Sequence, residues 1–194
     1  QMWKEYFGNE SNIYGVDINP NTAILRDDGF EIFIGDQADR QFLQSLIKNI
    51  PRIDILIDDG GHLMEQQIAT FEELYSHISP NGIYLCEDLH TSYWKRFGGG
   101  YKNLNSYIEY SKNFIDYINA WHSEEKAKYD ITGFTKSTYS LHYYDSMLII
   151  EKRKMDQPFS LDNNGKSEIQ SFEFKKDKKH IKSLIKRLKN SIKK

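Results

Sequence analysis

The sequence lacks the features that mark several large classes of protein. It contains one cysteine, Cys86, which excludes an intramolecular disulfide framework and is typical of a reducing compartment. No apolar run approaches the roughly 20 residues that a membrane-spanning helix needs, and no secretory signal peptide is visible. We therefore expect a cytoplasmic protein with one packed domain.

Three common catalytic signatures are also missing from the chain. There is no Gly-x-Ser-x-Gly elbow, no Gly-x-x-x-x-Gly-Lys-Ser/Thr loop and no Cys-x-x-Cys pair. These absences argue against a serine hydrolase, a P-loop nucleotide-binding protein and a cysteine-based zinc site.

The net charge of −2 hides an uneven distribution of charge along the chain. Residues 175–194 hold ten Lys or Arg and one Asp and so carry +9, which leaves −11 for the rest. Apolar residues at spacings of three and four predict a basic amphipathic helix in this tail. Such a helix is either solvated and packed on the domain, or frayed, or it contacts anionic lipid or an acidic partner. Nucleic acid is not an expected partner, because no aromatic residues alternate with the lysines.

A polar segment separates this tail from the remainder of the chain. Residues 157–167 contain too few apolar side chains to form a packed core. We therefore divide the chain into a domain over residues 1–153, a polar linker over 154–174 and a tail helix over 175–194.

Strand-like and helix-like segments alternate along the domain. This order predicts an α/β fold with a mostly parallel sheet, completed by a C-terminal antiparallel hairpin. A turn over residues 79–82 is expected to end the helix before the fourth strand. Strands are expected over residues 12–17, 31–35, 53–59, 83–86, 138–143 and 146–152, and helices over 40–50, 63–78 and 104–122.

Carboxylates follow two of these strands at the point where each strand ends. Asp59 ends one short apolar run, Glu87 and Asp88 end the next, and His62 lies just beyond the first. Runs of this kind are typical of strands that are buried on both faces. Neighbouring strands lie roughly 4.8 Å apart, and ligands bind beyond the carboxyl ends of parallel strands. Three converging carboxylates repel one another, so we expect a hard divalent cation between them.

Four motifs that place polar residues at strand ends occur in order: Ile13–Asp17, Gly35–Asp39, Ile57–His62 and Glu87–Trp94. Together they resemble the class I S-adenosylmethionine-dependent methyltransferases. More narrowly, the chain is similar to the metal-dependent macrolide-sugar and rhamnosyl O-methyltransferases, which are grouped with the cephalosporin-hydroxylase-like proteins. The resemblance runs from Gln1 to about Lys152 and implies a Rossmann-like methyltransferase sheet.

The resemblance assigns the methyl donor, S-adenosylmethionine, to the ends of the first strands. Asp17 would accept hydrogen bonds from the ribose hydroxyls, and its alternative role is to cap the helix that begins at Pro20. Asp36 and Gln37 would lie near the adenine, with helix capping as the alternative for Asp36. Asp58 would either face the donor or support its own loop.

The resemblance assigns the metal and the chemistry to the two neighbouring strand ends. Asp59, Glu87 and Asp88 would hold Mg²⁺, which prefers oxygen ligands and keeps positions for substrate hydroxyls. The alternative is that they are helix caps and surface acids. His62 would be the general base that takes the proton of a sugar hydroxyl. Three further residues are candidate substrate contacts: His90, Tyr93 and Trp94.

Methyltransferases of this kind carry a strand and a glycine-rich loop before the matching region, and the sequence begins at Gln1 without them. The first strand, apparently missing, would lie between the strands that end at Asp17 and Asp59. We therefore expect upstream residues in the complete protein, or another segment in that place. Direct pairing of the two strands would contradict this expectation.

These patterns together predict a Mg²⁺-dependent enzyme that transfers a methyl group from S-adenosylmethionine to a hydroxyl of a sugar, in a glycosylated metabolite or a polysaccharide. The expected partners are a small-molecule or saccharide substrate, with a homo-oligomer and a peripheral membrane contact through the tail as options. The alternative is a non-catalytic Rossmann-like binding module recruited through its basic tail. A nicotinamide-dependent dehydrogenase is disfavoured, because hydride transfer needs no such group of acids.

Overall fold

The structure is a computed structural model that describes residues 2–125, 128 and 130–161. The chain divides into two compact units, Gln1–Pro158 and Phe159–Lys194. The predicted tail helix, and the linker from residue 162 onward, lie outside the described residues. Within the described ranges, no helix is both long enough and apolar enough to cross a bilayer.

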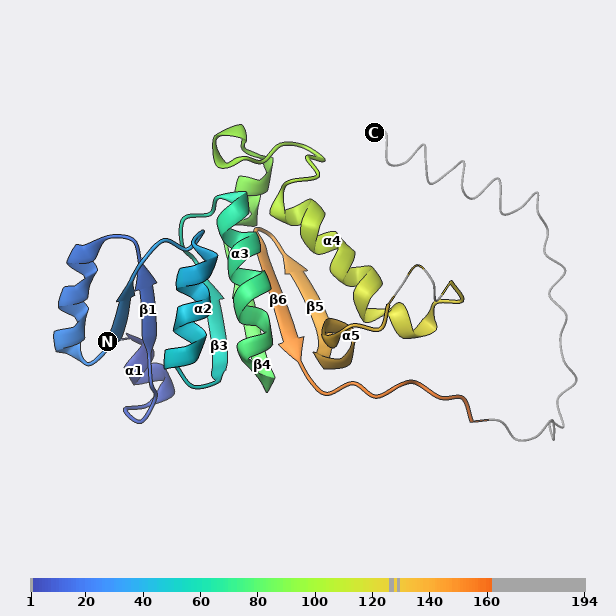
Figure 1. Cartoon of the computed structure of the whole chain (residues 1–194), viewed down its shortest axis with the longest axis horizontal. Coiled ribbons are helices and arrows are strands. Elements are labelled where there is room, and N and C mark those ends of the chain that lie inside the picture. The colour runs from blue at the N-terminus through green and yellow to red at the C-terminus, as the bar shows by residue number, and fades with distance from the viewer. Residues whose placement is uncertain (1, 126–127, 129, 162–194) are drawn as a thin grey trace, which may run out of the picture. The chain divides into compact units, whose positions relative to one another are not determined.

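The larger of two sheets in the first unit has the strand order β3-β4-β6-β5 (Figure 1). β3 (Ile53–Asp58) pairs in parallel with β4 (Ile78–Cys86). β6 (Met147–Lys152) runs antiparallel to both β4 and β5 (Thr138–Tyr144). The fold predicted from the sequence, with parallel strands completed by an antiparallel hairpin, is therefore confirmed.

The smaller sheet contains two strands, β1 (Tyr14–Asp17) and β2 (Glu31–Ile34), which pair in parallel. Among the described residues β1 pairs with β2 alone, and no ladder joins β1 to β3. Direct pairing of β1 with β3, which would have contradicted the expected intervening strand, is thus not observed. What lies between β1 and β3 in the complete protein stays a prediction.

Polar caps fix where two of the helical segments, η1 and α2, begin. The side chain of Asn19 accepts a hydrogen bond from the Asn21 amide, and that of Asp39 accepts from two amides of the helix after it. The capping roles left open for Asp17 and Asp36 therefore belong to Asn19 and Asp39. The helical segments are α1 (Met2–Phe7), η1 (Pro20–Asp28), α2 (Arg40–Asn49), α3 (Met64–Leu74), η2 (Tyr75–His77), η3 (Leu89–Tyr93), η4 (Lys95–Phe97), α4 (Tyr107–Ile118), η5 (Ala120–His122) and α5 (Gly133–Ser137).

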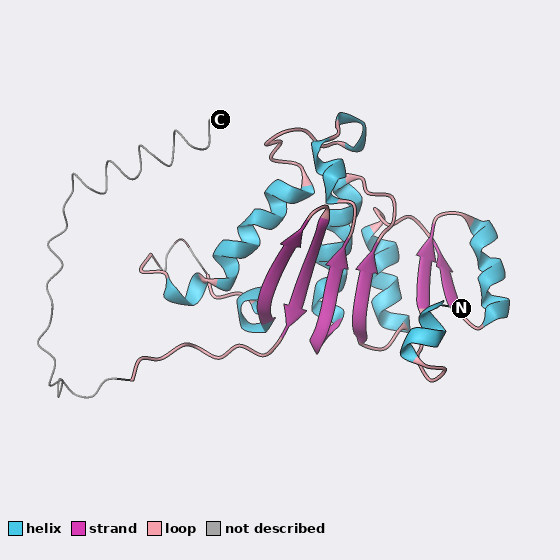
Figure 2. Ribbon diagram, turned by 180° about the vertical axis from the view of Figure 1, so that it is seen from behind, coloured by secondary structure: helices cyan, strands magenta, loops and turns pink. Residues whose placement is uncertain are grey.

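Helices cover one face of the larger sheet. Figure 2 shows the strands toward the viewer, with α2, α3 and α4 behind them. Leu56 of β3 points to the helices and is 8% exposed, whereas its neighbours Ile55 and Ile57 are 42% and 38% exposed. The prediction that β3 is buried on both faces is therefore wrong for the described residues, because no described helix covers its second face.

An aromatic cluster between the helices forms much of the core. Phe71 of α3 stacks on Phe114 of α4 with 4.4 Å between ring centroids, and Phe134 of α5 lies 5.0 Å from Phe114. These rings fix the three helices to one another. Aromatic pairs stabilise a core by more than the burial of their surface area alone. This packing holds α3 and α4 over β4, whose end carries the candidate site.

The predicted turn over residues 79–82 is instead an irregularity within β4. Helix α3 ends at Leu74, and β4 begins at Ile78. Ile53 is paired with Ile78 and Ile55 with Ile83, so four residues of β4 stand opposite one residue of β3. The turn-forming residues therefore bulge out of the strand rather than ending a helix.

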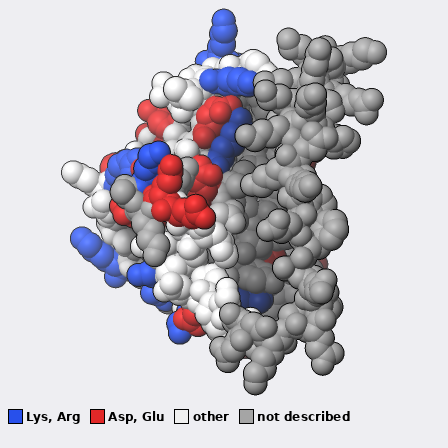
Figure 3. Space-filling model, turned by 90° about the vertical axis from the view of Figure 1, so that its right-hand side faces the viewer, with Lys and Arg blue, Asp and Glu red and all other residues white. Residues whose placement is uncertain are grey.

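Charged side chains of both signs are interspersed on the side of the molecule that Figure 3 shows. Arg40 of α2 pairs with Glu72 at 2.5 Å and Glu73 at 2.7 Å on α3. Exposed pairs of this kind contribute at most about 1 kcal/mol. The apolar core, rather than surface charge, therefore holds α2 and α3 together.

Candidate active site

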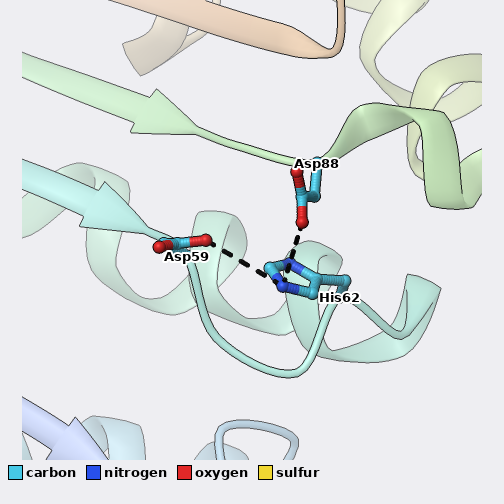
Figure 4. Close-up of side chains that lie close together, drawn as sticks. All are labelled: Asp59, His62 and Asp88. Atoms are coloured by element: carbon cyan, nitrogen blue, oxygen red, sulfur yellow. Dashed lines mark ion pairs between the residues drawn. The ribbon is translucent and has the colours of Figure 1, made fainter.

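The carboxyl ends of β3 and β4 bring two acids and a histidine together (Figure 4). Asp58 and Cys86 are paired in the β3–β4 ladder, so the residues that follow them leave the sheet at the same edge. The Nε2 atom of His62 lies 3.9 Å from an oxygen of Asp59 and 3.4 Å from an oxygen of Asp88. The convergence of these three residues was predicted from the sequence.

The two carboxylates of this cluster suit a hard divalent cation. One ligand atom from each of Asp59, His62 and Asp88 lies within 4.8 Å of the others. Among the described residues, Asp59 and Asp88 form ion pairs only with histidines, so no lysine or arginine neutralises the two carboxylates. Two carboxylates that open to solvent and pair with no lysine or arginine among the described residues fit Mg²⁺, which prefers oxygen ligands. Glu87, the third predicted ligand, does not join this group.

His62 and Asp88 both hold strained backbone conformations. Their φ angles are +56° and +52°, in the left-handed region that residues other than glycine rarely adopt. Such a conformation costs on the order of 1 kcal/mol and persists only where the surroundings fix it. The buried hydroxyl of Thr91 supplies one such constraint, since it lies 2.8 Å from the Asp88 carbonyl oxygen and 3.2 Å from that of His62.

Gln37 supports the loop that carries Asp59 and His62. Its amide nitrogen donates to Asp58 at 2.5 Å and to the hydroxyl of Thr70 at 2.8 Å. Its amide oxygen accepts from the backbone N–H of Gly61 at 3.1 Å. The side chain predicted to lie near the adenine is therefore engaged beneath the loop, where it ties β3 to α3.

Asp58 lies under the cluster and is 4% exposed. Besides Gln37, the hydroxyl of Tyr84 donates to it at 3.3 Å, and Tyr107 donates to Tyr84 at 3.2 Å. Burial raises the pKa of Asp58 to about 7, although the hydrogen bonds from Gln37 and Tyr84 oppose this rise. Of the two roles that the sequence left open for Asp58, this position favours support of the loop over contact with the donor.

Burial also keeps the neighbouring donors of this network protonated. It raises the pKa of Tyr84, of Tyr107 and of the Cys86 thiol well above their ordinary values. A buried thiol of raised pKa is a poor nucleophile. Cys86 therefore belongs to the support of the site and not to its chemistry.

The two glycines between Asp59 and His62 allow close packing of this support. A Cβ atom at Gly60 would overlap the amide oxygen of Gln37, and one at Gly61 would overlap that of Gln66. Gln66 in turn accepts from the backbone N–H of Leu63 at 3.2 Å, which completes the start of α3. The glycine pair thus lets two side-chain amides approach the loop from opposite ends.

His90 extends the site from Asp88 toward the β5–β6 hairpin. Its Nδ1 atom lies 3.8 Å from Asp88 and 2.6 Å from the hydroxyl of Ser146 in the hairpin turn. The indole of Trp94 contacts the His90 ring edge-to-face, with 4.6 Å between ring centroids. Tyr93 and His90 both line a cavity of about 400 Å³ beside the cluster, whereas Trp94 does not line it.

The predicted donor-binding acids stand at the ends of the smaller sheet. Asp17 ends β1, and its carboxylate accepts from the backbone N–H of Asn19 at 2.8 Å. Asp36 follows β2 and accepts from the N–H of Ala38 at 2.8 Å. Figure 2 shows the arrowheads of β1 to β4 at one edge, so both acids lie on the same side as the cluster. Their contacts with a donor stay predictions.

Two residues of the site could not be found from sequence patterns. Thr91 and Ser146 lie in loops, and each acts through a hydroxyl that bridges segments far apart in the chain. The only local signal is the position of Thr91, three residues after Asp88. For Ser146, a hairpin turn residue, no signal connects it to His90.

No protein-family model matches the chain. The 2'-O-methyltransferase of 8-demethyl-8-α-L-rhamnosyl tetracenomycin C from Streptomyces olivaceus is 32% identical over 154 residues, which are 79% of this chain and 40% of that enzyme. The mycinamicin VI 2''-O-methyltransferase of Micromonospora griseorubida is 30% identical over 162 residues, which cover 81% of this chain and 40% of the enzyme. The chain thus spans 40% of the length of these relatives.

A solved structure of similar sequence supports the same relation. The MycE methyltransferase of the mycinamycin biosynthetic pathway, in complex with Mg and SAH, superposes with a TM-score of 0.71 at 30% identity. The match covers 79% of this chain and 40% of that one. The chain is a homologue of sugar O-methyltransferases. Its fold is that of a class I S-adenosylmethionine-dependent methyltransferase, which confirms the resemblance stated from the four sequence motifs.

Proposed function

We propose that this chain forms the catalytic part of a Mg²⁺-dependent O-methyltransferase that methylates a sugar hydroxyl of a glycosylated small molecule. The observation that carries the proposal is the convergence of Asp59, His62 and Asp88 at the ends of β3 and β4. The homologues support it, because they are named as methyltransferases that act on sugar-bearing compounds. MycE, whose structure this chain resembles, was solved in complex with Mg and SAH, the demethylated donor.

The residues of the cluster divide the chemical task between them. Asp59 and Asp88 would hold the cation through their oxygens, with two or more positions left for solvent or substrate. The cation would stabilise negative charge on the acceptor oxygen, and the donor would supply an activated methyl group. The Nε2 atom of His62 faces the space between the two acids, where it can accept the hydroxyl proton.

His62 is assigned as the base rather than a metal ligand for two reasons. Imidazole is a poor ligand for Mg²⁺, whereas carboxylate oxygen is a good one. The other ring nitrogen of His62, Nδ1, is buried and makes no hydrogen bond to any described residue, so Nε2 is the nitrogen that faces the two acids. Thr91 and the loop glycines constrain the backbone that carries this imidazole.

The test is methyl transfer from radiolabelled S-adenosylmethionine to rhamnosyl and macrolide glycosides, with and without a chelator. His62→Ala should lower turnover by about 10² to 10⁴-fold, because a positioned base contributes that much, and it should leave donor affinity nearly unchanged. The matched control is His122→Ala, an exposed histidine outside the cluster. Equal turnover of the two variants would show that His62 is not the base, and activity in excess chelator would remove the metal from the proposal.

We also propose a cytoplasmic location, with no nucleic-acid partner and with self-association as an option. The basic segment 175–194 would contact anionic membranes peripherally. Support for this contact comes from its charge of +9 and its apolar periodicity. Vesicle co-sedimentation of the chain with and without residues 175–194 tests it, and equal binding by the two forms would refute it.

A further inference from the structure

We propose that the cavity beside His90 receives the aglycone of the acceptor, that is, an apolar ring system attached to the sugar that is methylated. This inference rests on the proposed function, because it assumes that the reacting sugar lies at the acid cluster. It assigns a task to the β5–β6 hairpin, which the catalytic assignment does not use.

The cavity adjoins the cluster through residues that the two share. His90 lines the cavity, and its Nδ1 atom is 3.8 Å from the Asp88 carboxylate. Ser146 joins the hairpin turn to η3 by accepting from the His90 N–H at 3.2 Å, and its carbonyl accepts from Leu89 at 3.0 Å. A ligand that reaches the acids therefore has the cavity as its neighbouring space.

The walls of the cavity are large apolar side chains that remain open to solvent. Tyr93 is 52% exposed, Tyr143 42% and Tyr144 60%, and Ile115 of α4 is 49% exposed. Solvent-exposed apolar groups gathered around one concavity are typical of a binding site. Tyrosine supplies a large rigid face at little cost in conformational entropy, which suits stacking against a ring. The volume of about 400 Å³ lies in the range of small-molecule pockets.

Three of the polar side chains around the cavity are already engaged by the protein. Lys112 is paired with Glu109, the imidazole of His90 contacts the Ser146 hydroxyl, and the Tyr143 hydroxyl donates to the backbone of α4 at 2.9 Å. These three side chains therefore offer a hydroxyl-rich ring few new hydrogen bonds, and the remaining polar lining groups are the Asp145 carboxylate and the hydroxyls of Tyr93 and Tyr144. An apolar ring would instead cover the exposed walls.

Binding measured without donor or metal separates this inference from the proposed reaction. The probes are p-nitrophenyl α-L-rhamnopyranoside, which carries an aromatic aglycone, methyl α-L-rhamnopyranoside, which carries none, and a methyl rhamnobioside, which carries a second sugar. Saturation-transfer NMR titration of the full chain gives the dissociation constants. The aryl glycoside should bind on the order of tenfold more tightly than the other two.

Variants of cavity residues then test whether the tighter binding of the aryl glycoside depends on the cavity. Tyr144→Ala and Ile115→Ala should each remove most of it, while Tyr101→Ala, an 81% exposed tyrosine outside the cavity, should retain it. Both altered side chains are exposed, and circular dichroism verifies that the variants fold. Equal affinity for all three probes, tighter binding of the rhamnobioside, or loss of the preference only in Tyr101→Ala would overturn the inference. Aryl-dependent binding by a chain that transfers no methyl group would count against the proposed function alone, and the cavity would remain a site for an apolar ring attached to a sugar.

Discussion

Removal of the Gln37 side chain tests whether the catalytic loop depends on the network beneath it. Gln37→Ala deletes three hydrogen bonds, to Asp58, Thr70 and the backbone of Gly61. Each is worth about 1 kcal/mol net, and the bond to the Asp58 carboxyl is worth more because its loss leaves a buried acid with one donor fewer. The free energy of unfolding should therefore fall by about 3 kcal/mol.

Urea denaturation followed by tryptophan fluorescence measures this loss. With a slope of about 2 kcal/mol per molar urea, the midpoint should fall by about 1.5 M. The matched control is Gln41→Ala, since Gln41 is an exposed glutamine on α2 whose side chain makes no hydrogen bond among the described residues. That variant should unfold within about 0.5 kcal/mol of the unaltered chain.

The same variant should weaken Mg²⁺ binding, because the loop that carries Asp59 and His62 loses its support. Groups that hold metal ligands in place typically contribute 10- to 100-fold in affinity, so a loss of about tenfold is expected. If Gln37→Ala and Gln41→Ala have the same midpoint and the same Mg²⁺ affinity, the network does not position the loop and the reasoning fails.

Three further changes follow from the structure. Thr91→Val removes the hydroxyl that bridges the carbonyls of His62 and Asp88, so titration should show Mg²⁺ affinity reduced about tenfold. Thr91→Ser keeps the hydroxyl and should keep the affinity. Equal loss of affinity in both variants would show that packing, and not the hydroxyl, is responsible. Phe71→Ala removes the ring at the centre of the aromatic cluster and should cost about 3–5 kcal/mol in urea denaturation, and a cost below about 1 kcal/mol would contradict the packing described. Burial, aided by Arg52, lowers the pKa of Lys152 from 10.5 to about 8. The folded state therefore releases this proton first, so the stability of the chain relative to Lys152→Met should rise between pH 8 and pH 10.5 and stay level below pH 8; a difference that does not change with pH would refute the shift.

Local patterns were sufficient to predict most of the fold and the centre of the site. The short apolar runs that end at Asp58 and Cys86 identified two parallel strands, and the sheet edge then brought Asp59 and Asp88 together. The Asp-Asp-Gly-Gly-His sequence placed His62 just beyond the end of a strand, and His62 adopts its positive φ there. The spacing of apolar residues, the residues of turns and the geometry of neighbouring strands depend on short stretches of chain, so they can be predicted directly from the sequence.

Features that depend on distant contacts could not be predicted in the same way. The sequence suggested Gln37 as a donor contact and left Asp58 open between the donor and its own loop. It gave no sign of the network that joins the two side chains to Tyr84 and Tyr107, residues far away in the chain. Glu87 looks equivalent to Asp88 in the sequence. The left-handed conformation of Asp88 redirects the chain there, and the cluster of three contains Asp88 without Glu87.

Titration calorimetry of the chain with Mg²⁺ tests the central claim most directly, that the acids at the ends of β3 and β4 bind a divalent cation. The unaltered chain should bind one ion, and Asp59→Asn and Asp88→Asn should each weaken binding by about tenfold or more, because each removes a charged oxygen ligand. Asp116→Asn, an exposed aspartate of α4 outside the cluster, should bind like the unaltered chain. Equal affinity in all three variants would contradict the account.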